Sequence, residues 1–273
     1  MWEERFADLS AVAARQNGLI TSVQAAGVGV EEAALARFAE TGLLTELDWA
    51  VHQLAWSTLG PRYAYPYAAW LALEPSRFAW ERRAAGVDAA LSHESACRLH
   101  GLGSVPGNLM IFTASVALEG PRATKVHLAP LAPEDVTVVE GVPVTTAQRT
   151  IADLLADWTD HGVVRGVLLD AVLKDLVDLR SVHEAVAPLA VRHEFPADGG
   201  DFVRYFLPDL APSQLSPRNL RSWAAMVLPD RVARVQPGAA RLIADAGGQA
   251  DARASWDLAA DIVGRSGQTG SPG

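Results

Sequence analysis

The sequence predicts an α+β fold, and three observations support this. Of the 273 residues, 49% are hydrophobic and 20% are charged, which suits packed apolar cores and excludes a wholly disordered chain. Segments with apolar residues at helical spacing alternate with short runs rich in valine and threonine, which are typical of strands. The length allows one to two domains of about 150 residues each. We expect an N-terminal module of helices and a hairpin, then a mixed α/β domain, then a helical C-terminal extension.

Residues 1–60 predict three short helices followed by a β-hairpin. The helices are expected over residues 3–16, 22–26 and 30–41, and the strands over residues 43–47 and 50–54. Thr21 is placed to cap the second helix, and Leu35 and Phe38 lie one turn apart on the inner face of the third. Three helices before a hairpin are the order of a winged helix-turn-helix, which is the fold we expect here, although other small α+β units share this order.

Residues 61–210 predict a mixed α/β domain. Strands are expected over residues 87–91, 109–115, 125–128, 136–139 and 142–145, and helices over residues 66–73, 76–83, 92–100, 163–173 and 181–191. The dipeptide Glu140-Gly141 is a two-residue hairpin signal with its glycine at positive φ, and Pro143 suits an edge strand. A further amphipathic helix is expected after the cap Thr146, with an apolar stripe that extends to Trp158.

Past residue 210 the sequence predicts a helical extension over residues 211–264 and a disordered tail over residues 265–273. Helices are expected over residues 217–227, 239–246 and 252–263. Five arginines of the extension are candidates for phosphate contacts, namely Arg218, Arg221, Arg231, Arg234 and Arg241. Residues 1–60, by contrast, carry three arginines against eight acidic side chains, in a chain whose net charge is −9. A strongly basic nucleic-acid-binding surface is therefore not evident from composition.

The composition and motifs narrow the class of protein. Cys97 is the only cysteine, which excludes an intramolecular disulfide and a multi-cysteine zinc site. No apolar run of about 18 residues predicts a membrane span, and the first residues lack the pattern of a secretory signal. The phosphate-binding and nucleophile motifs of common enzymes are also missing. We expect a cytoplasmic protein that is not an enzyme and has no cofactor or membrane partner.

One predicted helix carries three potential metal ligands. His93, Cys97 and His100 share a helix face, but the first and last lie about 10 Å apart along the axis, which is too far for one zinc ion. A pair of these residues with a remote ligand such as His127 stays open. We expect no metal site and assign Cys97 to the core.

Two segments resemble AbiEi-type antitoxin proteins. Residues 92–103 read S-H-E-S-A-C-R-L-H-G-L-G, similar to the family's S-H-x-S-A-A-x-L-H-G-L. Residues 141–154 read G-V-P-V-T-T-A-Q-R-T-I-A-D-L, similar to its G-x-P-V-T-T…R-T…D-L run. The resemblance covers roughly residues 5–205. It implies a winged helix that binds inverted repeats in its own promoter, and a cognate nucleotidyltransferase-like toxin whose neutralisation needs no stable complex.

The resemblance assigns DNA contacts to the second and third helices and the hairpin. The residues concerned are Thr21, Ser22, Gln24, Glu31, Ala33, Arg37, His52 and Gln53. The family's third helix is usually rich in arginine on its outer face and its wing often reads G-V-Y-R-L, whereas residues 50–54 here read A-V-H-Q-L. Acidic side chains near phosphates oppose binding.

Two functions therefore compete. The first is an antitoxin-like transcriptional regulator that represses its own promoter and counteracts a toxin. The alternative is an acidic protein-interaction module that acts on a basic partner protein without specific DNA binding. A relative that keeps the fold but has lost its toxin partner is a third hypothesis.

Overall fold

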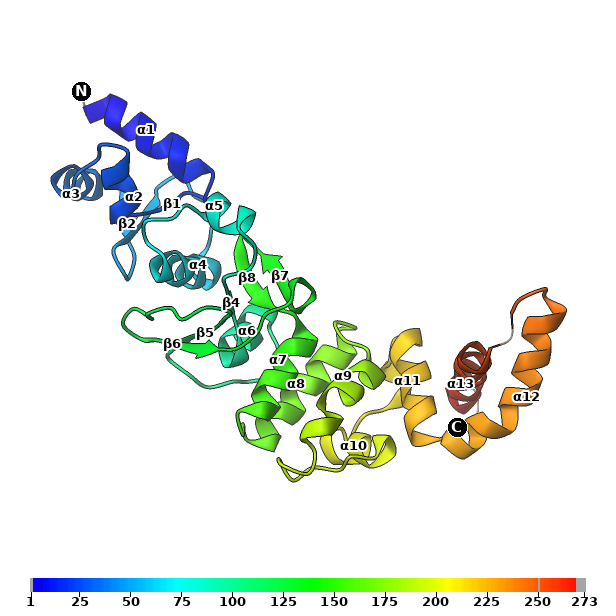
Figure 1. The fold of residues 1–273 in the computed structure, drawn as a ribbon. Helices are drawn as coiled ribbons and strands as arrows, with labels where there is room; N and C mark the ends of the chain where they lie inside the picture. The colour runs from blue at the N-terminus through cyan, green and yellow to red at the C-terminus, as the bar shows by residue number, and fades with distance from the viewer. Residues whose placement is uncertain (1, 250, 269–273) are drawn as a thin grey trace. The chain divides into compact units, whose positions relative to one another are not determined.

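The computed structural model describes residues 2–249 and 251–268, which form a mixed α+β structure (Figure 1). The chain divides into two compact units. Unit 1 comprises Met1–His100 and Pro106–Thr146, and unit 2 comprises Gly101–Val105 and Ala147–Gly273. The predicted domain boundaries after residues 60 and 210 fall inside these units.

The N-terminal part of unit 1 contains three helices and a three-stranded antiparallel sheet. They are α1 (Trp2–Ala14), β1 (Leu19–Thr21), α2 (Ser22–Gly27), α3 (Glu32–Glu40), β2 (Leu44–Glu46) and β3 (Val51–Leu54), with strand order β1-β3-β2. The predicted helices and hairpin are confirmed. Thr21 caps α2 as expected, because its Oγ1 accepts from the backbone N–H of Gln24 at 3.0 Å. Strand β1 was not expected, since three fully buried residues show no alternation.

The rest of unit 1 is a five-stranded mixed sheet with helices. The strands are β4 (Ala89–Leu91), β5 (Met110–Ala114), β6 (Thr124–Leu128), β7 (Val136–Val139) and β8 (Val142–Thr145), and the helices are α4 (Pro61–Leu73), α5 (Ala79–Ala84), α6 (His93–His100) and the 3₁₀ turn η1 (Pro133–Asp135). The strand order is β6-β5-β4-β8-β7. Strands β5 and β6 run parallel, and so do β4 and β8, whereas β4–β5 and β7–β8 are antiparallel.

The β7–β8 hairpin forms at the predicted turn. Glu140 and Gly141 take positive φ values of 47° and 87°, which a two-residue turn of this kind requires. The edge position expected for Pro143 is wrong, because β8 lies between β4 and β7. Proline is tolerated there because β4 pairs with β8 through Leu91 and Val144, so its missing N–H falls outside that pairing.

Two helix starts differ from the prediction for local reasons. Helix α4 begins at Pro61, five residues early, because a proline at the first helical position loses no hydrogen bond. Helix α5 begins at Ala79 and is not capped by Ser76. The carboxylate of Glu81 reaches back instead and accepts from the backbone N–H of Phe78 at 2.9 Å.

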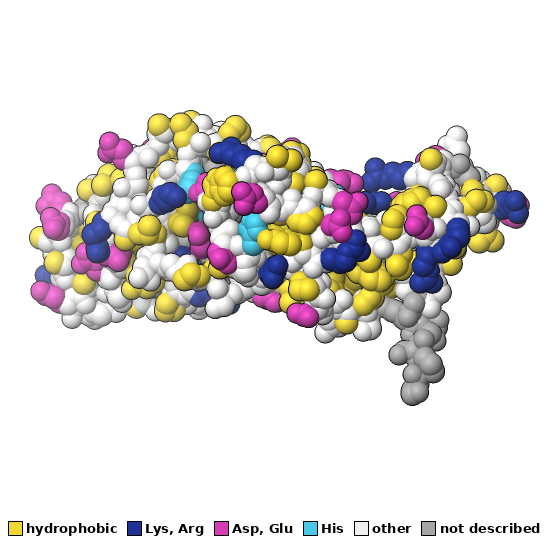
Figure 2. Space-filling view, turned by 90° about the horizontal axis from the view of Figure 1, so that it is seen from below, with side chains coloured by type: hydrophobic (Ala, Val, Ile, Leu, Met, Phe, Trp, Pro, Cys, Tyr) yellow, Lys and Arg dark blue, Asp and Glu magenta, His cyan; other side chains and the backbone are white. Residues whose placement is uncertain are grey.

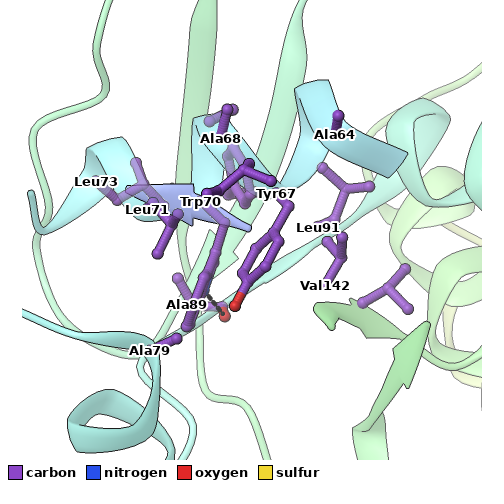
Figure 3. Packing of buried hydrophobic residues seen from close by; sticks show 14 of the residues in the cluster. Ala64, Tyr67, Ala68, Trp70, Leu71, Leu73, Ala79, Ala89, Leu91 and Val142 are labelled. Atoms are coloured by element: carbon purple, nitrogen blue, oxygen red, sulfur yellow. Dashed lines mark hydrogen bonds between the residues drawn. The ribbon is translucent and has the colours of Figure 1, made fainter. Parts of the chain in front are cut away.

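Helix α4 supplies the centre of the unit 1 core (Figure 3). Tyr67 and Trp70 are fully buried, and the indole Nε1 of Trp70 donates to the carbonyl of Ala89 at 3.1 Å. Leu19 and Val51 of the N-terminal sheet belong to the same cluster. Residues on both sides of residue 60 therefore contribute to one cluster, while other buried residues before residue 60, among them Leu35 and Phe38, form a second cluster.

Unit 2 is helical in its described residues. Its helices are α7 (Ala147–Ala156), α8 (His161–Leu173), α9 (Leu179–Val186), α10 (Gly199–Phe206), α11 (Pro217–Val227), α12 (Pro229–Asp245) and α13 (Ala252–Gln268), with 3₁₀ turns η2 (Ala187–Leu189) and η3 (Pro212–Gln214). The strands expected within residues 61–210 therefore all precede Thr146. Among the residues described in either unit, no helix is both long and apolar enough for a bilayer crossing.

Several predictions for unit 2 need correction. Trp158 does not extend the stripe of α7, because the chain leaves the helix before it and turns with φ 59°, which leaves the indole exposed. Helix α12 begins ten residues early because Pro229 starts it, and it continues through Pro237. Residues 265–268 are helical within α13, whereas residues 269–273 of the tail expected to be disordered lie outside the described residues.

A buried ion pair holds α5 against α4 and β4. Arg82 donates through Nε and Nη2 to the two carboxylate oxygens of Asp88, at 2.7 and 3.0 Å. The Arg82 side chain is fully buried, and its guanidinium lies 3.7 Å from the centre of the Trp70 ring. The same carboxylate accepts from the backbone N–H of Ala89 at 2.7 Å. Removal of the carboxylate would leave a buried charge without compensation.

The substitution Asp88→Ala is therefore expected to lower the free energy of unfolding of unit 1 by about 3–5 kcal/mol. Urea denaturation followed by circular dichroism measures this loss. Arg122→Ala is the matched control in the same unit, because it removes an exposed ion pair to Asp48 and should cost no more than about 1 kcal/mol. Equal losses in the two variants would show that the Arg82 pair is not the anchor of α5.

Candidate nucleic-acid interface

Helix α3 presents one exposed face and buries the other. Leu35 and Phe38 are buried as predicted, and the Phe38 ring packs edge-on against Phe6 of α1 with ring centres 5.2 Å apart. Ala33 and Arg37 are exposed on the opposite face. Small alanine side chains let a helix approach another surface closely, and Arg37 is the only basic residue within α3. The outer face of α3 is thus available for contact with another molecule.

Acidic side chains surround Arg37. Glu31, Glu32 and Glu40 are all exposed, and Figure 2 shows Asp and Glu side chains gathered over the part of the molecule that holds α1 to α3. Each of these carboxylates is repelled by a phosphate backbone, and Arg37 alone offsets little of that repulsion. Any DNA contact through α3 must therefore depend on base contacts made at low salt or on cations elsewhere in the chain.

Three residues that the resemblance assigned to DNA contact are buried in unit 1. Thr21, Gln24 and His52 are 1%, 2% and 6% exposed. The Thr21 hydroxyl donates to the carbonyl of Pro75 at 2.6 Å, and the Gln24 amide donates to the carbonyl of Arg77 at 2.8 Å. Polar side chains that are buried and bonded to backbone cannot reach base edges. Thr21 and Gln24 hold α2 in place in this way, whereas His52 is buried and bonded to the Ser22 side chain. Burial of all three corrects that part of the expectation.

Ser22 and Gln53 are half-buried and already bonded. The Ser22 hydroxyl pairs with the Nε2 atom of His52 at 2.9 Å, and the Gln53 amide donates to the carbonyl of Leu59 at 2.8 Å. Of the eight predicted contact residues, the structure therefore leaves Glu31, Ala33 and Arg37 exposed on and beside α3.

The turn of the β2–β3 hairpin is bound to another loop of unit 1. The indole Nε1 of Trp49 donates to the carbonyl of Arg122 at 2.6 Å, and the Arg122 guanidinium pairs with the carboxylate of Asp48. Trp49 and Ala50 take positive φ values of 64° and 54° to make this turn. The hairpin tip packs on the loop before β6, so it does not project as a free wing.

The arginines of unit 2 fall into two groups. Arg231, Arg234 and Arg241 are exposed; helical spacing places Arg234 and Arg241 opposite the buried residues Val232 and Ala239, and Arg231 at the edge of that face. Two exposed acids, Asp230 and Asp245, lie on the same side. Figure 2 shows Lys and Arg side chains gathered over the part of unit 2 that holds α11 to α13. These three side chains form an exposed basic face on one helix, which we call the α12 basic face.

The other two arginines of the predicted phosphate-binding set are engaged within unit 2. Arg218 pairs with Asp175 at 2.9 Å, and Arg221 pairs with Asp261 at 2.9 Å. The hydrogen bond to Asp261 is the first cause of a raised pKa at Arg221. Both guanidiniums therefore stabilise the packing of unit 2 and are less available for phosphates than the α12 basic face.

The three potential metal ligands of α6 have separate roles. His100 Nε2 bonds to the carbonyl of Thr145 at 2.8 Å. Cys97 is fully buried, and burial raises the pKa of its thiol to about 12, which keeps it protonated and a poor ligand. His93 stacks on His127 of β6, with ring centres 4.2 Å apart. Helical spacing alone does not predict that stacking, because His127 lies on a strand remote in the sequence.

No protein-family model matches the chain, and neither does any curated protein. The assignment of a function therefore depends on the residues and geometry described above. The exposed face of α3 and the α12 basic face are the two surfaces at which they suggest contact with a partner.

Acidic pH is expected to destabilise unit 1 through His52. Burial lowers the pKa of His52, partly opposed by the nearby Glu46 carboxylate. The unfolded chain binds a proton near pH 6.5, so the contribution of neutral His52 is complete above about pH 6.5. It is lost as the pH falls from there towards the folded-state pKa. Urea denaturation at about pH 7.5 and about pH 5.5 should show a smaller unfolding free energy at the lower pH.

The variant His52→Gln is the control for this effect. Burial also lowers the pKa of His193 in unit 2. His193 is present in both wild type and variant, so both proteins lose its contribution to stability at the lower pH. The variant should lose less stability between the two pH values than the wild type does. An identical pH dependence in both proteins would contradict the assignment to His52.

Proposed function

We propose that this chain is an antitoxin-like transcriptional regulator whose unit 1 contains a winged helix-turn-helix. The observation that carries the proposal is the element order α1-β1-α2-α3-β2-β3 with an antiparallel β1-β3-β2 sheet and an exposed outer face on α3. In helix-turn-helix modules the second helix of the motif lies in the major groove. Because α3 follows α2 in the chain, the proposal gives α3 the role of this second helix.

Base contacts would come from α3 and its start. Arg37 is a long, exposed donor of the type that reads guanine in the major groove. Glu31 precedes the helix and can accept from the amino group of cytosine. Ala33 and Ala36 leave room for the helix to approach the bases.

Phosphate contacts would come from the α12 basic face. Its three arginines are exposed, whereas those of α11 are paired with aspartates. Phosphate contacts position a DNA-binding protein, and base contacts determine which DNA sequence it prefers. These two tasks would fall to different units of the chain.

The substitution Arg37→Ala is expected to weaken binding to the chain's own promoter about tenfold, because one good arginine–guanine contact is worth about 1–3 kcal/mol. A gel-shift titration with a promoter fragment that contains inverted repeats, at low salt, measures this change. Arg5→Ala is the matched control, since Arg5 is an exposed arginine of α1 in the same unit. If the wild-type chain binds the promoter fragment no more tightly than it binds random DNA, the regulator function is excluded.

The same titration at several salt concentrations tests the α12 basic face. Replacement of Arg231, Arg234 and Arg241 by alanine should reduce the slope of log affinity against log salt by about 2–3, because each neutralised phosphate contributes about 0.9. The control is Arg253→Ala, which removes an exposed arginine of α13. It should change the slope of log affinity against log salt by less than half a unit.

The acidic protein-interaction module is the second candidate, and a specific observation favours it. Three exposed glutamates lie just before α3 and at its two ends, and the hairpin tip is bound through Asp48 to Arg122 rather than free. Such a surface complements a basic partner, and the resemblance suggests a nucleotidyltransferase-like toxin.

Co-expression of the chain with the toxin encoded beside it separates the two functions. If α3 acts on a basic toxin, changing Glu31, Glu32 and Glu40 to glutamine should abolish rescue of growth and weaken a salt-sensitive complex about tenfold or more. If the chain acts as a regulator, the same variant should rescue growth fully and bind DNA more tightly. Full toxicity beside the unaltered chain would exclude both antitoxin functions.

A further inference from the structure

A groove in unit 1 passes the first turn of α4. A cavity of about 650 Å³ is lined by residues 56–63 together with Asn17 of the loop after α1 and Glu140 of the β7–β8 turn. A second cavity, of about 220 Å³, shares Pro61 and Arg62 with the first and continues to Tyr65, Arg98 and Met110. We call these two cavities together the α4 groove. The larger cavity has the size of ordinary small-molecule sites.

Aromatic side chains line the α4 groove. Trp56 and Tyr65 are 47% and 39% exposed, although large aromatic side chains are usually buried. Tyr63, which lies between these two residues in the sequence, is half-buried. An exposed indole or phenol face at the wall of a cavity is a platform on which a planar ring can stack.

Two guanidiniums line the narrower part of the groove. Arg62 donates through Nη2 to the carbonyls of Arg98 and Leu99, at 3.2 and 2.8 Å, which fixes its position at the end of α6 while the side chain stays exposed. Arg98 donates through Nη2 to Ser95 Oγ and to the carbonyl of Leu109, both at 2.8 Å. Its Nη1 is buried and has no acceptor among the described residues. No carboxylate lines this cavity, although Glu94, one turn before Arg98 on α6, acts electrostatically on that guanidinium. An anionic group there would meet two cations and one nearby acid outside the lining.

The wider part of the groove carries one carboxylate. Glu140 is exposed, and the amide of Asn17 donates to its main-chain carbonyl at 2.9 Å, which holds the turn in position. A carboxylate beside a stacking platform can accept from an amino group on the edge of a nucleobase. Arginine suits phosphate because its planar fork presents several donors.

We propose that the α4 groove binds a nucleoside phosphate, with the phosphate on Arg62 and Arg98, the base stacked on Trp56 and the Glu140 carboxylate accepting from an amino group of the base. This site is independent of the proposed DNA contact through α3. The ligand is either a free nucleotide or the terminal nucleotide of a single strand, since both present the same groups.

Isothermal titration of the full chain tests the proposal with nucleoside monophosphates, the matching nucleosides and inorganic phosphate. We expect cytidine or guanosine monophosphate to bind at least tenfold more tightly than uridine monophosphate, which lacks the amino group. The nucleosides and phosphate alone should bind at least tenfold more weakly than the monophosphate. A 5′-phosphorylated tetranucleotide that binds more tightly than the monophosphate would identify a strand as the ligand, and weaker binding would identify the free nucleotide.

Variants assign the binding to the groove. Trp56→Ala and Arg62→Ala should each weaken binding at least tenfold, and Glu140→Gln should remove the preference over uridine monophosphate. Trp158→Ala and Arg253→Ala, at exposed positions of unit 2, should bind as the wild type does. Circular dichroism checks that each variant is folded. If Arg62→Ala fails to fold, Glu140→Gln and Trp56→Ala decide the question.

Three outcomes would overturn the proposal. One is the absence of binding by any nucleotide at millimolar concentration. Another is equal binding of inorganic phosphate and the nucleotides, which would show a plain anion site. The third is nucleotide binding that is unchanged in Trp56→Ala and Glu140→Gln, which would place the ligand elsewhere.

Discussion

Two buried glutamine side chains fix the N-terminal helices to the segment around α5, and the rest of unit 1 depends on this connection. Gln16 donates to the Gln24 side chain at 2.9 Å and accepts from the backbone N–H of Ala79 at 2.8 Å, while Gln24 donates to the carbonyl of Arg77. Each of these amides would cost about 1–3 kcal/mol if it were buried without partners. Fully bonded, they join segments about 60 residues apart in the sequence and make the first 60 residues part of one body with the mixed sheet.

This connection determines which surfaces remain for function. The Gln24 side chain of α2 is buried and bonded inside unit 1. The hairpin tip is bound through Trp49 and Asp48 to the loop at Arg122. A module of this element order usually offers a recognition helix, the preceding helix and a free wing. Here only the outer face of α3 is left, and its charge is mostly negative. The two proposed functions differ in how that face is used, either close to bases with cations supplied by α12 or against a basic protein.

The burial of α4 has a similar consequence for the groove at its first turn. Tyr67 and Trp70 hold the helix in the core, and Trp70 is also stacked against the Arg82 guanidinium that pairs with Asp88. Arg62 and Tyr65 therefore project from a helix that cannot move independently of the sheet. A site built on such a helix is largely formed before a ligand arrives, which lowers the entropy lost on binding.

Local signals in the sequence determined the helices α1 to α3, the cap at Thr21, the turn at Glu140 and Gly141 and the limits of α11, because each depends on residues within one or two turns. The tertiary structure alone decided that Thr21 and Gln24 are buried, since their partners Pro75 and Arg77 lie more than 50 residues away. It also decided that β5 and β6 are parallel and that Trp158 is exposed. Periodicity reports which face of an element is apolar, whereas the polar groups that meet across a core depend on the path of the whole chain.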